Sequence, residues 1–310
     1  MKKTTIGGQA LIEGVMMRGP ESIAIAVRKP DGEIVLEKKE LKFKKNILTK
    51  VPGVRGVIEF FRMMVVGVKA LMFSAEFVDV EEEDGKESKF DTFLQKVFGD
   101  KMMDVVIYTS VILSIGFSVG LFFLLPQFLA NLLHFDKNTA SGVIYFNLFE
   151  GVIRIAIFLG YIMLTSLLKD IQRVWQYHGA EHKTIHCYEH EEELTVENVR
   201  KFTTKHPRCG TSFLFIVMII SILVFAFTGW HNIWINLALR LLFVPVIAGL
   251  SYEVLKFAGR HCENPIIKVM NMPGMAFQYF TTREPDDKQI EVAIEAFKSV
   301  LVNDEEADKW

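Results

Sequence analysis

The sequence predicts a mainly α-helical integral membrane protein with about four transmembrane helices, a small N-terminal β-hairpin or sheet element, and cytoplasmic loops. Half of the 310 residues are hydrophobic and 26 are phenylalanine, yet 23% carry a charge. This combination indicates apolar residues concentrated in membrane spans beside soluble parts. Long uncharged stretches, and Lys and Arg residues gathered in alternate connecting segments, agree with that fold class.

Composition argues against two classes of protein. The formal net charge of -2 argues against a nucleic-acid partner, which would need a basic surface. The three cysteines, Cys187, Cys209 and Cys262, are too few for a disulfide framework and favour a reducing compartment. The opening Met-Lys-Lys is followed by no apolar core, so we expect no signal peptide.

Residues 1–53 are expected to form a cytoplasmic segment that contains β-structure. Polar and apolar side chains alternate in residues 22–28 and again in residues 33–39, and a Pro-Asp-Gly sequence at 30–32 lies between them. Alternation is the period of a half-buried strand, and Asp-Gly favours a tight turn. These residues therefore predict a β-hairpin.

A glycine-rich stretch at residues 7–19 precedes this hairpin. Its four glycines among apolar residues predict a tightly folded, partly buried loop, because glycine allows close backbone approach and positive φ. The charges of Glu13 and Arg18 allow two interpretations. Either these two side chains pair with each other, or Glu13 reaches a functional site.

Residues 54–104 are expected to hold an interfacial helix and an acidic linker. Residues 54–78 are apolar but contain five charged side chains, which predicts an amphipathic helix on the membrane surface or a helix packed against the spans. The basic residues of 38–50 suit an anionic leaflet. The acidic segment 81–89 predicts an exposed linker.

The four-helix transmembrane region is expected at residues 105–250. Its helices are apolar stretches with few or no charges, and two short turns separate the first span from the second and the third from the fourth. We place the four spans at Val105–Leu133, Val143–Leu168, Thr211–Gly229 and Ile235–Leu250.

Charge in the connecting segments predicts the orientation. Lys and Arg are abundant before the first span, in the His-rich segment 169–210 and in the tail 251–310, and nearly absent from the two short turns. The positive-inside rule therefore puts both termini and the His-rich loop in the cytoplasm. Within the tail, residues 289–302 have the apolar spacing of a soluble amphipathic helix, preceded by carboxylates that favour the positive helix end.

Three charged side chains lie at membrane depth in these predicted spans: Glu150, Arg154 and Arg240. Such residues are costly in a bilayer and are usually paired inside a helix bundle. Glu150 and Arg154 are four residues apart, which allows a structural ion pair. The alternative is that these charges line a transport path. Four spans leave little room for such a path in a monomer.

The segment 175–190 carries the strongest chemical signal. His178, Glu181 and His182 follow the order His-x-x-Glu-His, and residues four apart lie one turn above each other on a helix. Two imidazoles could bind one divalent metal, with Glu181 as the base that activates water, as in the inverted zinc-hydrolase motif. The plain alternative is a polar helix face whose histidines contact water, and Gly179 weakens the helix prediction.

Three more residues are candidates for a third metal ligand. Cys209 and His206 precede the third span and Glu253 follows the fourth, so the topology brings all three to the membrane face that carries His178 and His182. Zinc accepts thiolate, imidazole and carboxylate ligands. The alternatives are a plain buried thiol at Cys209 and an ion pair of Glu253 with Lys256 or Arg260. A straight second span would carry His178 about 15 Å below the apolar edge, whereas Glu253 lies nearer to that edge. Bringing them together requires a kink or a fourth helix that extends inward.

Five stretches of the chain form specific motifs. They are the glycine-rich stretch 7–19, His-Gly-Ala-Glu-His-Lys at 178–183, His-Pro-Arg-Cys-Gly-Thr-Ser-Phe at 206–213, Ser-Tyr-Glu at 251–253 and Thr-Thr-Arg-Glu-Pro-Asp-Asp at 281–287. Together they resemble the YqhQ-like bacterial membrane proteins over almost the whole chain. The resemblance implies a multi-pass protein of the bacterial inner membrane and a metal-dependent enzyme, without a substrate. Cys262 and His190 fall outside the motifs and are weaker ligand candidates.

Three functions agree with these features. The first hypothesis is a zinc-dependent hydrolase at the cytoplasmic membrane face, with a peptide bond, a lipid-linked ester or a phosphoester as substrate. The second is a scaffold or assembly factor that holds a structural metal, and the third is a transporter of small solutes or ions that acts as an oligomer. The bilayer is the expected partner, and a homo-oligomer or a membrane-protein partner stays open. An open, water-bearing coordination position would favour catalysis over a structural metal.

Overall fold

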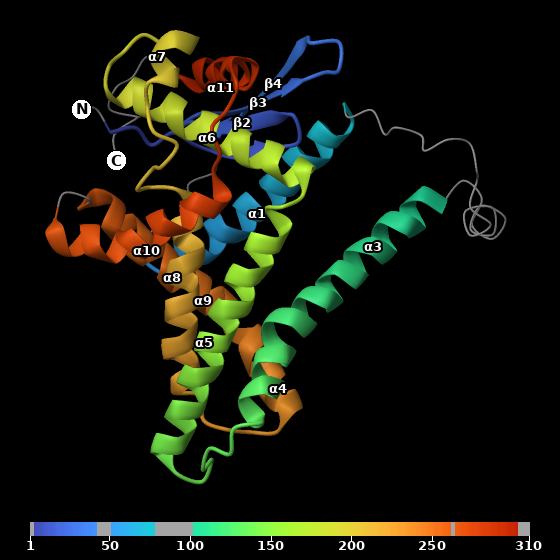
Figure 1. Cartoon of the computed structure of the whole chain (residues 1–310), viewed down its shortest axis with the longest axis vertical. Helices are drawn as coiled ribbons and strands as arrows, with labels where there is room; N and C mark the ends of the chain where they lie inside the picture. The colour runs from blue at the N-terminus through green and yellow to red at the C-terminus, as the bar shows by residue number, and fades with distance from the viewer. Residues whose placement is uncertain (1–2, 42–50, 78–101, 262–263, 303–310) are drawn as a thin grey trace. The chain divides into compact units, whose positions relative to one another are not determined.

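The computed structural model describes residues 3–41, 51–77, 102–261 and 264–302 (Figure 1). The chain divides into two compact units. The first unit contains the N-terminal sheet and all candidate ligand residues, and the second contains the helices around the first predicted span. The predicted acidic linker at 81–89 lies outside the described residues. The ranges of the first unit are 1–78, 160–224 and 240–310, and those of the second are 79–159 and 225–239.

Four antiparallel strands form the N-terminal sheet in the order β1-β2-β3-β4. The predicted hairpin of residues 22–39 is confirmed: β3 pairs with β4, and Gly32 has a φ of 92° in the turn between them. Each strand pairs with its neighbour in sequence, so the sheet is built from local turns alone. The strands are β1 (Gly7–Leu11), β2 (Gly14–Arg18), β3 (Ser22–Arg28) and β4 (Ile34–Glu40).

The predicted loop at residues 7–19 is wrong, because this stretch forms the hairpin of β1 and β2. Glycine is a weak strand signal in the sequence, but the packing requires it here. A Cβ on Gly14 would lie 2.4 Å from the carbonyl oxygen of Ala26 on the neighbouring strand. Glu13 takes the tight turn with a φ of 51°. Its carboxylate pairs with Arg173, whereas Arg18 pairs with Glu59, so the predicted Glu13–Arg18 pair does not form.

Helices cover both faces of this sheet, which explains why its strands are apolar on both sides. Helix α1 (Val54–Ala75) packs on one face, against Met16 and Ile25 among others. Helices α6 (Lys169–Glu189) and α11 (Asp287–Val300) pack on the other face, against Met17 and Ala24 among others (Figure 1). Successive strand residues point to opposite faces, so β1, β2 and β3 contribute to both cores, whereas β4 contributes Ile34 to the core under α6 and α11.

The predicted C-terminal helix is confirmed as α11. Asp286 and Gln289 form a capping box at its N-terminus, in which each side chain accepts the other residue's backbone N–H. Its apolar stripe is completely buried, with Ile290, Phe297 and Val300 at 0% exposure. The tail thus completes the core of the first unit.

Helix α1 lies within the predicted helical region 54–78 and contacts the N-terminal sheet through Ala70. Near its start, a Cβ on Gly56 would lie 2.8 Å from the carbonyl oxygen of Gly249 in helix α9 (Ile233–Arg260), so the two backbones touch. The remaining side of α1 exposes large apolar residues, as an interfacial helix would. These residues are Phe61, Met64, Val65, Val68, Leu71 and Met72.

Three helical segments of the described chain are long and apolar enough to cross a membrane, which indicates membrane association. They are Thr109–Asn131, Ala140–Thr165 and Ile233–Arg260, and they correspond to three of the four predicted spans. The remaining prediction corresponds to α8 (Gly210–Ala226), whose apolar part, Phe213–Ala226, is shorter. The first segment joins α3 (Met102–Val119), the π-helix η3 (Gly120–Leu124) and α4 (Leu125–Asn131), and the second is α5.

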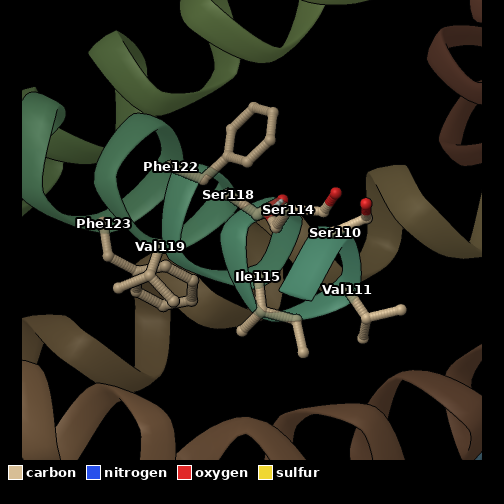
Figure 2. A pocket seen from close by; sticks show the side chains of 8 residues that line it. All are labelled: Ser110, Val111, Ser114, Ile115, Ser118, Val119, Phe122 and Phe123. Carbon is tan, nitrogen blue, oxygen red and sulfur yellow. Dashed lines mark hydrogen bonds between the residues drawn. The ribbon is translucent and has the colours of Figure 1, made fainter. Parts of the chain in front are cut away.

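A shallow groove runs along α3 and η3 (Figure 2). Ser110, Ser114 and Ser118 follow one another at four-residue intervals, and Ser118 Oγ donates to the Ser114 carbonyl oxygen at 2.8 Å. Apolar side chains, such as Ile115 and Phe122, form the rest of the lining. All eight lining residues come from one continuous helical segment, so the groove is a feature of its surface and we assign it no function.

The charges of α5 form an ion pair within the second unit. Glu150 and Arg154 pair one turn apart, and both side chains are largely buried. Arg154 Nε also donates to the Phe122 carbonyl oxygen at 2.9 Å. A buried cation with a carboxylate and a carbonyl as partners is a stable arrangement at membrane depth. The pairing favours the structural interpretation of these charges over a transport path.

The chain breaks between α5 and α6, where a continuous span would have carried the histidines away from the membrane edge. Helix α5 ends at Thr165 and α6 begins at Lys169. Ser166 stabilises the break: its hydroxyl oxygen accepts Trp175 Nε1 at 3.1 Å, and its carbonyl oxygen accepts Arg283 Nη2 at 3.2 Å. The required kink is therefore present, and α6 takes its own direction over the sheet.

Candidate metal centre

The His-x-x-Glu-His motif lies on a buried helix. Every residue of α6 from Tyr177 to Cys187 is buried, and the ring centroids of His178 and His182 are 4.4 Å apart. Helical spacing therefore stacks the two imidazoles on one side. The plain alternative, histidines that contact water, does not hold for this pair, because their exposed fractions are 8% and 1%.

Backbone carbonyls orient both imidazoles. His178 Nδ1 lies 2.7 Å from the Thr281 carbonyl oxygen, and His182 Nδ1 lies 2.5 Å from that of Thr204. A carbonyl oxygen only accepts hydrogen bonds, so both Nδ1 atoms donate to the backbone, and the Nε2 atoms are left for other partners. This outer arrangement is typical of metal-binding histidines. Within the described structure, the buried His182 Nε2 has no hydrogen-bond partner.

Cys209 completes a group of three potential ligands. Its Sγ lies 3.2 Å from His178 Nε2, and all three ligand atoms lie within 4.8 Å of one another. Burial alone would raise the pKa of the Cys209 thiol, but His182 and His178 outweigh it and hold that pKa well below its usual value. Burial would lower the pKa of His178, but Cys209, Glu181 and the Thr281 carbonyl oxygen together outweigh burial and raise that pKa to about 9. The site thus favours thiolate, the form that binds metals.

Glu181 lies beside this group. Its Oε1 accepts the backbone N–H of Gly8 in β1 at 2.9 Å, and its Oε2 is buried without a hydrogen-bond partner in the described structure. Only glycine allows this approach, since a Cβ on Gly8 would lie 2.9 Å from the Glu181 carboxyl carbon. Burial raises the pKa of Glu181, which makes its carboxylate a better proton acceptor near neutral pH.

A second group, formed by His186, Glu189 and His206, also contains two imidazoles but has a carboxylate where the first group has a thiol. Glu189 already accepts the Thr4 backbone N–H at 3.0 Å and pairs with Arg208. His206 lies between the Arg208 backbone N–H and the Glu189 carboxylate, and burial lowers its pKa to about 4. A cation here would have to displace a guanidinium, so we interpret this group as a structural polar network.

The structure separates the three candidates for a third ligand. Cys209 lies with His178 and His182, whereas His206 belongs to the second group. Glu253 on α9 pairs with Arg55 and accepts the Gly53 backbone N–H at 3.1 Å, and it belongs to neither group. Glu253 therefore forms an ion pair, as the alternative expected, but its partner is Arg55 and not the expected Lys256 or Arg260. In the part of the chain described, no fourth His, Cys, Asp or Glu joins the group of His178, His182 and Cys209.

Residues 281–287, which follow helix α10 (Pro265–Thr281), hold α6 in place. Thr281 offers its carbonyl oxygen to His178, and Arg283 donates its backbone N–H to the Trp175 carbonyl oxygen at 2.9 Å. Glu284 pairs with the buried Lys183. The sequence singled out this motif without indicating its role. The groups that orient α6 and His178 are backbone groups, whose contacts cannot be predicted from the side chains of the motif.

Gly179 is expected to be essential for this contact. A Cβ there would lie 2.0 Å from the Arg283 carbonyl oxygen, and backbone cannot move as a flexible side chain can. We expect Gly179→Ala to lower the free energy of unfolding by about 1–3 kcal/mol, measured by thermal unfolding in detergent. Gly160→Ala in α5 is the control, because nothing lies within 4 Å of its Cβ position. Equal stability of the two variants would contradict the prediction.

Comparison with known proteins agrees with the resemblance inferred from the motifs. Residues 51–303 match the family model described as "Protein of unknown function (DUF1385)". The chain is also 37% identical over 301 residues to the uncharacterized protein YqhQ of Bacillus subtilis (strain 168), covering 95% of this chain and 92% of that protein. No solved structure matches this chain.

Proposed function

The chain belongs to the DUF1385 family, and we propose that it is a metal-dependent hydrolase of the zinc type, bound to the membrane. One observation carries the proposal: two buried imidazoles, whose Nδ1 atoms are bonded to backbone carbonyls, have their potential ligand atoms within 4.8 Å of the Cys209 sulfur. Three protein ligands with a remaining open position are typical of catalytic zinc, whereas structural zinc usually has four. The metal, when bound, would lower the pKa of a water molecule.

Glu181 is proposed as the general base. Its Oε1 is held by the Gly8 N–H, which leaves Oε2 free to accept a proton beside the three ligands. The electrostatic influence of both histidines on its carboxylate supports this proximity. The protein itself therefore orients the base, keeps it dry and holds it next to the ligand group.

A scaffold with a structural metal is the second candidate. The observation in its favour is the strong burial of the ligand group, since Cys209 is only 6% exposed and His182 1%. The transporter hypothesis loses support from the paired state of Glu150 and Arg154. Glu181→Gln separates the first two candidates, because only an enzyme needs the carboxylate as a base.

Metal analysis of the purified full-length protein tests the proposal directly. We expect about one zinc per chain after loading, and its loss in Cys209→Ser, because a hydroxyl is a poor replacement for a thiolate. Cys187→Ser is the matched control: Cys187 is buried but donates to the Glu193 carbonyl oxygen at 3.5 Å, as a serine could. Equal zinc content in both variants would sink the assignment of Cys209.

The proposed orientation puts the metal centre on the cytoplasmic side of the inner membrane. A cysteine at the exposed Glu193 should resist a membrane-impermeant maleimide in intact cells and react after permeabilisation. A cysteine at the exposed Asn138, in the turn before α5, should react in intact cells. Labelling of position 193 from outside would overturn the orientation and the proposed location of the site.

A further inference from the structure

Helix α10 presents an apolar surface that the metal chemistry does not use. One stripe of the helix faces the protein, through Ile267, Asn271, Gly274 and Gln278. The rest of its circumference exposes six large apolar side chains, each between 40% and 69%. An apolar surface of this extent marks an interaction site in a folded protein. The six residues are Ile266, Val269, Met270, Met272, Tyr279 and Phe280.

The distribution of these residues around α10 favours contact with lipid over contact with a second helix. A helix that packs on α10 would cover a narrow stripe with a spacing of three and four residues. Here Val269 and Met270 are adjacent in sequence, and Met272 lies on yet another side of the helix, all of them at least half exposed. A wide apolar arc of this kind is typical of a helix immersed in a membrane interface.

The charges around α10 suit an anionic leaflet. Residues 264–283 contain no Asp or Glu, and Lys268 is exposed on the helix. Lys205 holds its ammonium 3.4 Å from the centre of the Tyr279 ring. Tyrosine and lysine side chains together are characteristic of the level of the lipid headgroups.

The path of the chain supports the same location. Candidate span α9 ends at Arg260, and α10 begins at Pro265, where the Asn264 side chain caps it by accepting the Ile266 N–H at 2.9 Å. Figure 1 shows α10 lying across the direction of α8 and α9. A helix that starts where a span ends and then runs across it follows the membrane surface.

We propose that α10 is an in-plane membrane helix, whose exposed side is immersed in the boundary between headgroups and acyl chains of an anionic phospholipid leaflet. Its buried stripe then connects the bilayer to both histidine groups, because Thr281 orients His178 in the metal centre and Gln278 bonds both backbone groups of His206 in the second group. The membrane location of α10 does not depend on which metal binds, or on whether the site is catalytic.

Fluorescence quenching by lipid tests this placement. A bimane label is attached to Val269→Cys or Met272→Cys in a Cys262→Ser background, where the remaining Cys187 and Cys209 are buried. Glu295→Cys on the exposed side of α11 is the control position, and the background protein itself should take up no label. The proteins are reconstituted in vesicles of phosphatidylcholine and phosphatidylglycerol with brominated acyl chains.

We expect brominated lipid to remove most of the emission from labels at 269 and 272 and little from the label at 295. Omitting phosphatidylglycerol should weaken the quenching at 269, since Lys268 then loses its attraction to the surface. Labels at 269 and 272 that are as unquenched as the label at 295 would overturn the proposal. Disulfide-linked dimers of the unlabelled Val269→Cys protein, together with unquenched emission from the labelled protein, would assign the surface to a second copy. Quenching without dependence on lipid charge would refute the anionic preference.

Discussion

Alanine at His178 or at His182 is expected to abolish stoichiometric metal binding while the helices still insert into the membrane. Each substitution deletes one imidazole lone pair, and alanine has no atom that replaces it. Loss of a mere outer partner of a metal ligand already costs about 10- to 100-fold in affinity. Loss of the ligand itself should cost more, and we expect metal content near the background level by elemental analysis.

Two matched variants sharpen this result. His190→Ala removes an exposed histidine whose Nδ1 bonds only the nearby His186 carbonyl oxygen, and it should keep full metal content. His186→Ala disturbs the second group, because His186 Nε2 bonds the Lys205 carbonyl oxygen at 2.8 Å, and it too should keep its metal. Full metal occupancy in a His178→Ala, His182→Ala double variant would show that the metal binds elsewhere.

Glu181→Gln is expected to keep the metal and the fold and to lose function. Glutamine preserves the side-chain size and the oxygen that accepts the Gly8 N–H, but it removes the negative charge and the basic lone pair. Loss of a general base typically lowers the rate by about 10²–10⁴-fold. The measurements are metal content, thermal unfolding and complementation of a strain that lacks the gene, with Glu193→Gln at an exposed position as control.

The other outcomes of this experiment have distinct meanings. If the variant keeps metal and complements fully, Glu181 is structural and the scaffold is the better interpretation. If metal and complementation are lost together while the fold persists, Glu181 is itself a ligand and the analogy with inverted zinc hydrolases is wrong. A pattern of retained metal and lost complementation supports the hydrolase, because a structural role predicts no such separation.

Part of the fold was predictable because it depends on local signals. The hairpin of residues 22–39 follows from alternation and an Asp-Gly turn, and α11 follows from its apolar spacing and the acidic residues before it. The hairpin of residues 7–19 was missed because β2 is buried on both faces and both strands contain glycine. Such a strand shows no alternation of polar and apolar residues. Gly8 and Gly14 are required by close contacts with atoms that are distant in sequence.

Helix α10 was missed for a related reason. Pro273 lies inside it, and its apolar residues cover more than one stripe, so the sequence has no clear helical period there. The helix exists because Ile267, Asn271 and Gln278 pack against the protein. Its C-terminal carbonyl, at Thr281, then becomes the group that orients His178.

By itself, the sequence determined the membrane character, the strand and helix signals with a regular period, and the pairing of His178 with His182, since four-residue spacing on a helix suffices for that. Only the tertiary structure decided the surroundings of each candidate ligand. Cys209 approaches the histidines because α8 begins beside α6, while Arg55 pairs with Glu253 and Arg208 pairs with Glu189. The physical reason is that a side chain can bind a metal only if its ligand atom is still available after packing. Whether it is available depends on contacts with backbone carbonyls and with cations distant in sequence, which leave no local signal in the sequence.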